Sequence, residues 1–184
     1  MGTDKAFISL GGRPLIEHAL VLARSVTADV SIVGDAAKFS VFGATVPDVF
    51  AVRGPLGGIH AALSDSRCEH NLILAVDLSF IEKSFLKYLV HSALSSNALV
   101  TVPSADGYLH TLCAIYRKSF LPIVTRALED GRNKIDALFP EIMVNVIPQE
   151  ELTAAGFSVA MFRNLNTPED LEMARKELES RQHL

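Results

Sequence analysis

Apolar residues along the chain switch repeatedly between helical and strand-like spacing. In residues 14–26, apolar side chains recur every three or four positions behind Pro14, which predicts an amphipathic helix that opens at this proline. The same spacing predicts four further helical segments, at 59–66, 81–95, about 119–129 and near 133–139. The sequence Thr167-Pro168-Glu169-Asp170 combines a capping hydroxyl with a proline suited to the first helical turn, and it predicts the start of a last helix.

Short apolar runs lie between these helices and predict strands. They cover 31–34, 71–76, 97–103, 111–116 and 142–147, with another apolar run around 44–46. The run at 71–76 is continuously apolar, as in a parallel-sheet strand buried on both faces. Pro103 is expected to stop the strand before it, and Asp106-Gly107 to form a turn. The alternation predicts an α/β fold, with a mostly parallel sheet and helices on both faces, in one domain over residues 1–184.

Composition and charge narrow the class of protein. Apolar residues make up 49% and charged residues 21% of the chain, which excludes disordered and fibrous classes. The net charge of −4 argues against a surface for duplex nucleic acid. Cys68 and Cys113 are too few for a disulfide framework or a four-ligand zinc site. The sequence shows neither a signal peptide nor an apolar stretch of ~20 residues, so the expectation is a cytoplasmic protein with no membrane partner.

Ligands in open α/β sheets bind beyond the carboxyl ends of the strands, so residues that follow buried strands are candidates. Asp77 directly follows the run at 71–76, where its carboxylate could bind Mg²⁺ and a nucleotide phosphate or could cap the turn at Leu78 and Ser79. The segment Gly54-Pro55-Leu56-Gly57-Gly58 precedes a predicted helix. Its glycines could let the backbone approach a ligand closely, or could serve a tight turn alone.

Three further groups of polar residues could bind anions or a base. Lys5 lies in a glycine-containing segment and suits a phosphate, although most lysines are simply solvated. Asn164 and Asn166 alternate in an extended segment, so both amides point the same way and could read a base edge or satisfy their own loop. Arg132 and Lys134 could hold an anionic second substrate or lie at a solvated helix start.

The segments MGTDKAF, GPLGG, ILAVDLSF, LHTLCAIYRKSF and FRNLNTPEDLEMAR occur in an order that resembles the molybdenum cofactor guanylyltransferases over almost the whole chain. This resemblance implies a Rossmann-like nucleotidyltransferase fold. It also implies transfer of GMP from GTP to molybdopterin with Mg²⁺, and release of pyrophosphate. Molybdenum insertion proteins and acceptor molybdoenzymes are the further partners that it suggests.

The resemblance also assigns roles to individual residues. Lys5 and Asp77 are implied to be catalytic, with Asp77 as the metal ligand, and Asn164 and Asn166 to bind molybdopterin or take part in catalysis. Arg132 and Lys134 are a weaker inference for the molybdopterin side. The residues implied to bind GTP are Gly2, Lys5, Asp48, Gly54, Pro55, Leu56, Gly57 and Asp77.

Two departures from the family pattern stand out. Where the family has D-x-P-F, this chain has Asp77-Leu78-Ser79-Phe80, which frees the turn after the aspartate. The family pattern also has a first strand and a loop of the form LAGGxSxRMGxDKA, and this sequence starts at its methionine. The expectation is therefore a fold without that strand and without half of the loop. A cytidylyltransferase, another small-molecule nucleotidyltransferase or a non-catalytic pterin-binding or partner-binding protein remain the alternatives.

Overall fold

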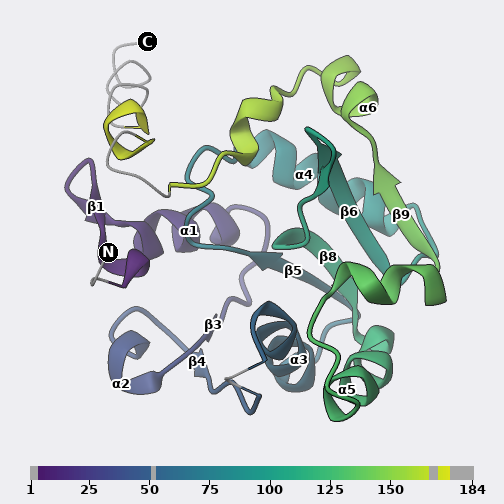
Figure 1. The fold of residues 1–184 in the computed structure, drawn as a ribbon. Helices are drawn as coiled ribbons and strands as arrows, with labels where there is room; N and C mark the ends of the chain where they lie inside the picture. Colours follow the sequence, from purple (N-terminus) through teal and green to yellow (C-terminus); the bar gives the residue numbers. More distant parts are fainter. Residues whose placement is uncertain (1–3, 51–52, 166–169, 175–184) are drawn as a thin grey trace.

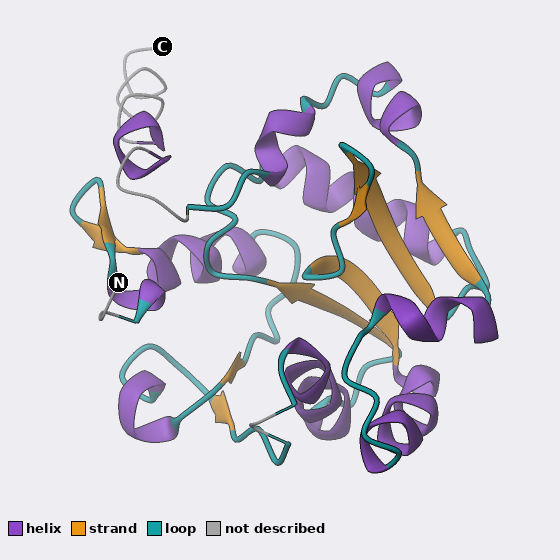
Figure 2. Cartoon of the chain, viewed as in Figure 1, coloured by secondary structure: helices purple, strands orange, loops and turns teal. Residues whose placement is uncertain are grey.

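The computed structural model describes residues 4–50, 53–165 and 170–174. Its helices are α1 (Leu15–Arg24), α2 (Ala36–Phe39), α3 (Pro55–Asp65), α4 (Lys83–Leu94), α5 (Leu121–Glu129) and α6 (Gln149–Ala154). Its strands are β1 (Ser9–Leu10), β2 (Arg13–Pro14), β3 (Ile32–Val33), β4 (Thr45–Val46), β5 (His70–Leu74), β6 (Val100–Ala105), β7 (Tyr108–Leu109), β8 (Cys113–Arg117) and β9 (Val144–Ile147). Helices and strands alternate along the chain and pack together as layers (Figures 1 and 2).

The strands form separate sheets rather than one. β1 and β2 make a small antiparallel hairpin, and β3 pairs with β4 in parallel. The large sheet has the order β5-β8-β6-β7, with β9 on the other side of β6. Because β8 runs antiparallel to both β5 and β6, and β9 runs parallel to β6, the strands β5, β6 and β9 share one direction. The predicted α/β fold is confirmed, with a mixed sheet in which β8 and the short β7 are reversed.

Helices cover both faces of the large sheet. Along β8, Cys113 and Ile115 belong to the core under α4, whereas Ala114 and Tyr116 belong to the core under α3 and α5. This division follows from the alternation of side chains along a strand. α4 contributes Phe85, Leu86 and Leu89 to its side of the sheet, and the other side buries Leu56, Ile59 and Leu63 of α3 with Val124 and Leu128 of α5.

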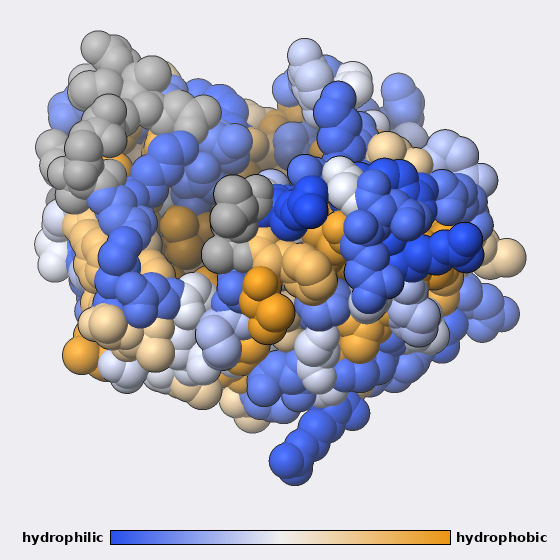
Figure 3. Space-filling model, turned by 60° about the horizontal axis from the view of Figure 1, so that its bottom comes forward, coloured by the Kyte–Doolittle hydropathy of each residue, from blue (hydrophilic) through white to orange (hydrophobic). Residues whose placement is uncertain are grey.

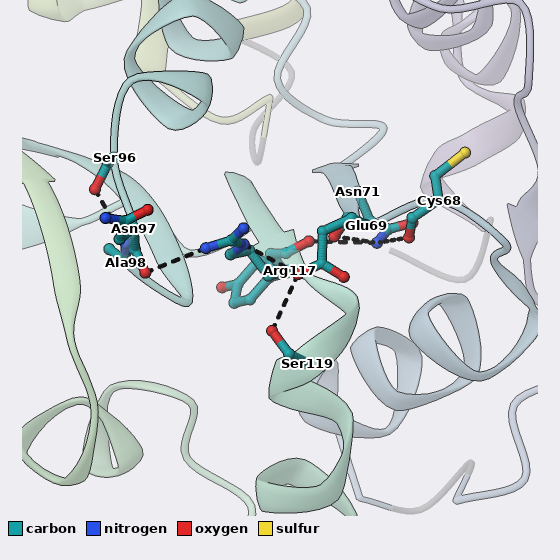
Figure 4. A network of polar contacts seen from close by, with 9 residues as sticks. Cys68, Glu69, Asn71, Ser96, Asn97, Ala98, Arg117 and Ser119 are labelled. Atoms are coloured by element: carbon teal, nitrogen blue, oxygen red, sulfur yellow. Dashed lines mark hydrogen bonds and ion pairs between the residues drawn. The ribbon is translucent and has the colours of Figure 1, made fainter.

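A polar network fixes the amino end of β5, remote from the end that leads to Asp77. Arg117 donates from Nε to Glu69 Oε1 at 3.0 Å and from a terminal nitrogen to the Asn97 carbonyl at 3.3 Å. Ser119 Oγ donates to the same Glu69 oxygen at 3.1 Å (Figure 4). These contacts join β8, the start of β5 and the loop before β6, so their role lies in sheet assembly.

Several sequence expectations are corrected by the structure. β6 continues through Pro103 to Ala105, because β8 pairs with β6 only at Val100 and Thr101 and needs no N–H from residue 103. The carbonyl of Pro103 accepts a hydrogen bond from His110 N at 2.9 Å, and the turn at Asp106-Gly107 is confirmed. The short helices α2 and α6 follow no long apolar period and were not predicted. The cap of the last helix at Thr167 lies outside the described residues, and residues 170–174 are helical.

The helix predicted over 59–66 begins at Pro55, so the GPLGG segment is the first turn of α3 and not a loop before it. Its capping residue, Gly54, has φ of 64° and ψ of −155°, a conformation that favours glycine. Pro55 follows in the first turn, where its missing N–H has no partner to lose. The glycine and proline together set where α3 starts.

Candidate active site

Lys5 and Asp77 lie together although 72 positions separate them in the sequence. Lys5 Nζ is 3.3 Å from Asp77 Oδ2, and the two side chains are 40% and 20% exposed. Lys5 opens a short 3-10 helix whose cap is the Asp4 carboxylate, which accepts from Ala6 N at 3.2 Å. The buried Ala6 anchors this turn against α1, so the lysine is held at the sheet edge by local structure.

Asp77 stands beyond the carboxyl end of β5, as the sequence predicts. Ala75 N still donates to the Leu112 carbonyl at 2.8 Å, which keeps the chain in line with β8 just before the aspartate. The N–H of Leu78 donates to the Ala75 carbonyl at 3.4 Å, so the turn is closed by backbone and does not need the Asp77 carboxylate at that group. The carboxylate is therefore directed to Lys5 and partly to solvent.

The segment around Asn164 reaches the same place from the far end of the chain. Leu165 N donates to the Asp77 carbonyl at 3.1 Å, and the Leu165 side chain is buried in the core beneath α4. Asn164, the preceding residue, is exposed. Residues near positions 5, 77 and 164 thus meet at one edge of the fold. Gly2 and Asn166 lie outside the described residues.

Asp48 and the start of α3 are packed against each other. The Asp48 carboxylate accepts from Phe50 N at 2.8 Å. A Cβ atom on Gly57 would lie 2.8 Å from the Phe50 carbonyl oxygen and 3.0 Å from a carboxylate oxygen of Asp48. The space beside Gly57 is therefore filled by the Phe50 carbonyl and the Asp48 carboxylate of the chain itself, and not by a ligand. Leu56 is fully buried, so its side chain packs in the core and is not available to a nucleotide.

One large cavity connects these two groups of candidates. Its volume is about 940 Å³, and its lining includes Asp48, Gly54 and Pro55 on one side and Val76, the neighbour of Asp77, on the other. The start of α3 and the end of β5 therefore border the same space. Gly34, which follows β3, lies at this border as well.

Arg132 and Lys134 are placed differently from the other candidates. Arg132 donates to Glu141 Oε1 at 2.6 Å and has Asp130 Oδ2 at 3.9 Å, so two carboxylates engage its guanidinium. Lys134 is exposed beyond α5. Within the described residues, no hydrogen bond or ion pair links either cation to Lys5, Asp77 or Asn164.

Arg163 is a cation that the sequence analysis missed. Its guanidinium carbon lies 5.0 Å from the ring centroid of Phe80, a cation–π contact between the segment DLSF and the residue before Asn164. Beside it is a recess of about 250 Å³ whose lining includes Phe80, Phe157 and Arg163. The position of Arg163 directly before Asn164 was the one signal in the sequence that could have pointed to this residue. Its contact with Phe80 was not predictable, because the two residues are far apart in the sequence.

The half-buried His110 and the buried Cys113 lie near the same half of the sheet. His110 stacks on Phe162 with ring centroids 4.1 Å apart, and burial lowers its pKa, an effect that a hydrogen bond to the Ala105 backbone and the charge of Asp106 partly offset. Burial raises the pKa of the Cys113 thiol to about 12, so this thiol stays protonated and is a poor nucleophile. Cys68 is exposed.

The residues present suit a metal ion that arrives with a substrate better than a resident one. In the part of the chain that the structure describes, no group of three or more histidine, cysteine, aspartate or glutamate residues could hold a metal ion. Asp77 offers a single, partly exposed carboxylate. Mg²⁺ commonly binds through one or two carboxylates, with substrate phosphates and water completing its shell, so the site fits this mode of binding.

None of the helices in the described residues combines the length and apolar character needed to cross a membrane.

Comparison with known proteins identifies the family and the fold of the chain. Residues 1–164 match the family described as MobA-like NTP transferase domain. A molybdenum cofactor guanylyltransferase of Desulfosudis oleivorans is 33% identical, with 94% of this chain and 86% of the relative covered. A probable molybdenum cofactor guanylyltransferase of Pelotomaculum thermopropionicum is 32% identical, with 95% of this chain and 85% of the relative covered.

Two solved structures share the fold. Molybdopterin-guanine dinucleotide biosynthesis protein A of Archaeoglobus fulgidus superposes with a TM-score of 0.83 at 28% identity, covering 97% of this chain and 92% of its own. The 2-C-methyl-D-erythritol 4-phosphate cytidylyltransferase of Thermus thermophilus has a TM-score of 0.72 at 16% identity, covering 95% and 94%, and at that identity it supports the fold alone. With Lys5, Asp77 and Asn164 converging at the sheet edge and the family match spanning most of the sequence, the chain belongs to the MobA-like NTP transferase domain family.

Proposed function

We propose that this chain transfers GMP from GTP to molybdopterin, forming the guanine dinucleotide of the cofactor and pyrophosphate. The observation that carries the proposal is the convergence of Lys5, Asp77 and the Asn164 segment beyond the carboxyl end of β5. Nucleotides bind at this edge of α/β sheets. Relatives named molybdenum cofactor guanylyltransferase, at 33% and 32% identity, support guanine over cytosine and molybdopterin as the acceptor.

The reaction requires the protein to align the two substrates and to stabilise the negative charge of the phosphates, and no covalent intermediate is required. An oxygen of the terminal phosphate of molybdopterin forms a bond to the α-phosphorus of GTP, and the bond from that phosphorus to the bridging oxygen of the β-phosphate breaks. Pyrophosphate leaves with the electron pair. In such transfers catalysis comes mainly from positioning and from electrostatic stabilisation of the phosphoryl oxygens.

Lys5 and Asp77 suit these demands together. The Lys5 ammonium is a mobile point charge that can move from the carboxylate to a phosphate, since its side chain is 40% exposed. Asp77 would hold Mg²⁺, which when bound offsets the charge of the triphosphate. Before the substrates bind, the ion pair between the two residues holds both side chains in the site.

We assign the nucleotide to the side of Asp48 and α3, and molybdopterin to the side of Asn164 and Asn166. The first turn of α3, with Gly54, presents backbone N–H groups near Asp48. For the anionic end of molybdopterin we assign Arg163, which directly precedes Asn164 and lies over the Phe80 ring, with Arg132 in a secondary role. Lys134 keeps a secondary role as a surface cation. We place the reaction in the cytoplasm, where acceptor molybdoenzymes and molybdenum insertion proteins would receive the product.

The test is a transfer assay with purified chain, Mg²⁺, molybdopterin and either GTP or CTP labelled at the α-phosphate. We expect label from GTP in the dinucleotide product, with an equal amount of pyrophosphate. Label from CTP alone would overturn the guanine assignment. Binding of molybdopterin without transfer from either nucleotide would instead support a non-catalytic pterin-binding protein.

A further inference from the structure

The turn that presents Asp77 is weakly fixed by its own backbone. The hydrogen bonds from Leu78 N to the Ala75 carbonyl and from Ile81 N to the Leu78 carbonyl are both 3.4 Å long. Bonds of this length lie beyond the usual range for an N–H donor and a carbonyl oxygen. The Ser79 hydroxyl oxygen is buried and, in the described part of the chain, has no hydrogen-bond partner. The direction of the Asp77 carboxylate therefore depends on contacts from outside the turn.

Two contacts from the Asn164 segment hold this turn at its first and last residues. Leu165 N donates to the Asp77 carbonyl at 3.1 Å, a shorter bond than those that the turn makes itself. Arg163 places its guanidinium carbon 5.0 Å from the centroid of the Phe80 ring, where the face of the ring attracts a cation. Both contacts come from a segment that is remote in sequence. That segment therefore sets how the turn lies.

The segment at 160–165 is firmly held and can serve as a support. Arg163 Nε donates to the Ala160 carbonyl at 3.2 Å, so one hydrogen bond and one ring together orient the guanidinium. The Phe162 side chain is 5% exposed, and its ring meets the Phe85 ring edge-on with the centroids 5.3 Å apart. A side chain packed in this way moves little, because the core around it is densely filled.

The Asp77 turn lies between the large cavity and the recess beside Arg163. Val76 lines the cavity of about 940 Å³, whereas Phe80 and Arg163 line the recess of about 250 Å³, and the two share no lining residue among those described. α3 also lines the cavity, and on the face of the molecule that carries α3, apolar residues reach the surface between hydrophilic ones (Figure 3). With the nucleotide assigned to the side of α3 and molybdopterin to the other side, the turn separates the two substrates.

We propose that Arg163 is a positioning residue of the transfer site, which fixes the Asp77 carboxylate through the Phe80 ring and the hydrogen bond from Leu165. The inference rests on the proposed function, because it assigns Arg163 a role toward the metal ligand of that reaction. Residues that orient a metal ligand commonly change metal affinity when they are removed. Arg163 thereby acts on the binding of metal and nucleotide, in addition to its contact with the acceptor.

This role has a consequence that a contact with molybdopterin alone does not have. A cation that only binds the acceptor leaves the binding of metal and nucleotide unchanged when no acceptor is present. A positioning residue changes that binding even in the absence of molybdopterin. It also acts on the metal-dependent part of the affinity, because its effect passes through Asp77.

The experiment is an isothermal titration of the whole chain with GTP, without molybdopterin, once with Mg²⁺ and once with EDTA. Arg163→Met should weaken GTP binding by about tenfold with Mg²⁺ and should leave binding in EDTA nearly unchanged. Arg163→Lys keeps a cation that can lie over the Phe80 ring but loses the planar group that also reaches Ala160, so its loss should be smaller. Asp77→Asn gives the size of the whole metal contribution.

Arg117→Met is the matched control for the removal of an arginine. Arg117 also donates hydrogen bonds through its guanidinium, but it does so at the amino end of β5, remote from the Asp77 turn. We expect this variant to bind GTP as the parent chain does, with Mg²⁺ and with EDTA, at a temperature where it is folded. A fall in stability alone therefore does not imitate the expected result.

Two further measurements test the path from Arg163 to Asp77. Exchange of the Leu165 amide hydrogen should become about tenfold faster in Arg163→Met, because the turn that accepts its hydrogen bond is less firmly held. This readout needs no nucleotide. Phe80→Leu removes the ring and keeps an apolar side chain in the core. The double variant with Arg163→Met should lose no more affinity for GTP and Mg²⁺ than the weaker-binding single variant, because both changes break the same contact.

The outcomes separate this inference from the proposed function. Parent-like GTP affinity of Arg163→Met with Mg²⁺, together with a loss in Asp77→Asn, would overturn the positioning role and leave the transfer reaction in place. Equal losses for Arg163→Met with Mg²⁺ and with EDTA would also overturn it, since the arginine would then bind the nucleotide directly. No loss in Asp77→Asn would overturn the metal role of Asp77, and with it the function assigned to Arg163.

Discussion

At the scale of single residues, Asp77 carries the proposed metal site. Asp77→Asn keeps the size of the side chain but replaces a carboxylate with an amide, a poorer ligand for a hard dication. We expect Mg²⁺-dependent transfer from GTP to fall by about 100-fold or more, the size of a lost electrostatic contribution of several kcal/mol. Steady-state rates over a range of Mg²⁺ concentrations measure this. Unchanged turnover would contradict the metal role, whereas the Lys5–Asp77 pair is exposed enough that stability should change little.

Lys5 allows a separate test of the phosphate role, with a matched control close by. Lys5→Ala should weaken GTP binding by about tenfold, as expected for a charge-assisted hydrogen bond to phosphate, and should weaken molybdopterin binding less. Lys38 forms a similar ion pair, 3.4 Å from Asp4, outside the proposed site. Lys38→Ala should leave both affinities unchanged. Isothermal titration with each substrate decides, and equal losses of both affinities in Lys5→Ala would contradict the assignment.

The place of Asp77 was predictable, because a carboxylate directly after a buried strand is a local signal, whereas the role of Lys5 came from the family resemblance and stays a prediction. The bond from Leu165 to Asp77 and the stacking of Arg163 on Phe80 were not predictable, since each joins residues that are remote in sequence. The contact of Arg132 with Glu141, nine residues further along the chain, was not predicted either, and the role of Arg132 toward molybdopterin stays a prediction.

At the scale of elements, the first turn of α3 depends more on Gly57 than on Gly58. Gly57→Ala should destabilise the protein by about 1–3 kcal/mol, because its Cβ would meet the Phe50 carbonyl at 2.8 Å and would displace Asp48. Gly58→Ala is the matched control, since the nearest atom to its Cβ, on Val33, is 3.9 Å away. This change should be neutral or stabilising, as alanine favours helices.

Urea unfolding of both variants measures the difference. A Gly57→Ala variant as stable as Gly58→Ala would show that the Phe50 and Asp48 segment moves aside at no cost. If it does move, GTP affinity in the Gly57→Ala variant should still fall, because Asp48 would leave the border of the cavity.

Periodicity predicted most elements here, and it failed where other constraints decide. The start of α3 was placed too late because glycines and a proline disfavour a helix by propensity, yet Gly54 and Pro55 open one. The predicted end of β6 was too early. A proline lacks the backbone N–H donor, and this loss matters only where a neighbouring strand needs that hydrogen bond. The reversed direction of β8 depends on how the chain returns after the turn at Asp106-Gly107, and apolar runs carry no such information.

At the scale of the whole molecule, the stack of His110 on Phe162 holds the end of the β6–β7 hairpin against the segment that leads to Asn164. His110 Nε2 is buried, and within the described residues it has no hydrogen-bond partner. Protonation would place a charge in this packed position between the β6–β7 hairpin and the segment that leads to Asn164. The histidine therefore links the acid stability of the fold to the geometry of the proposed molybdopterin side.

The pH dependence follows from the lowered pKa of His110. In the unfolded chain the imidazole binds a proton near its ordinary pKa of about 6.5, whereas in the folded protein it does so only at lower pH. Below about pH 6.5 the unfolded state therefore binds more protons, and the free energy of unfolding falls as the pH is lowered toward the folded pKa.

His110→Phe keeps a ring on Phe162 and cannot be protonated, so the free energy of unfolding of this variant should fall less between pH 7 and pH 5. Urea unfolding at several pH values compares it with the parent chain and with His91→Gln, a change at an exposed histidine that should retain the parent's pH dependence. Identical slopes for His110→Phe and the parent chain would mean that the pKa of His110 is not lowered in the folded protein.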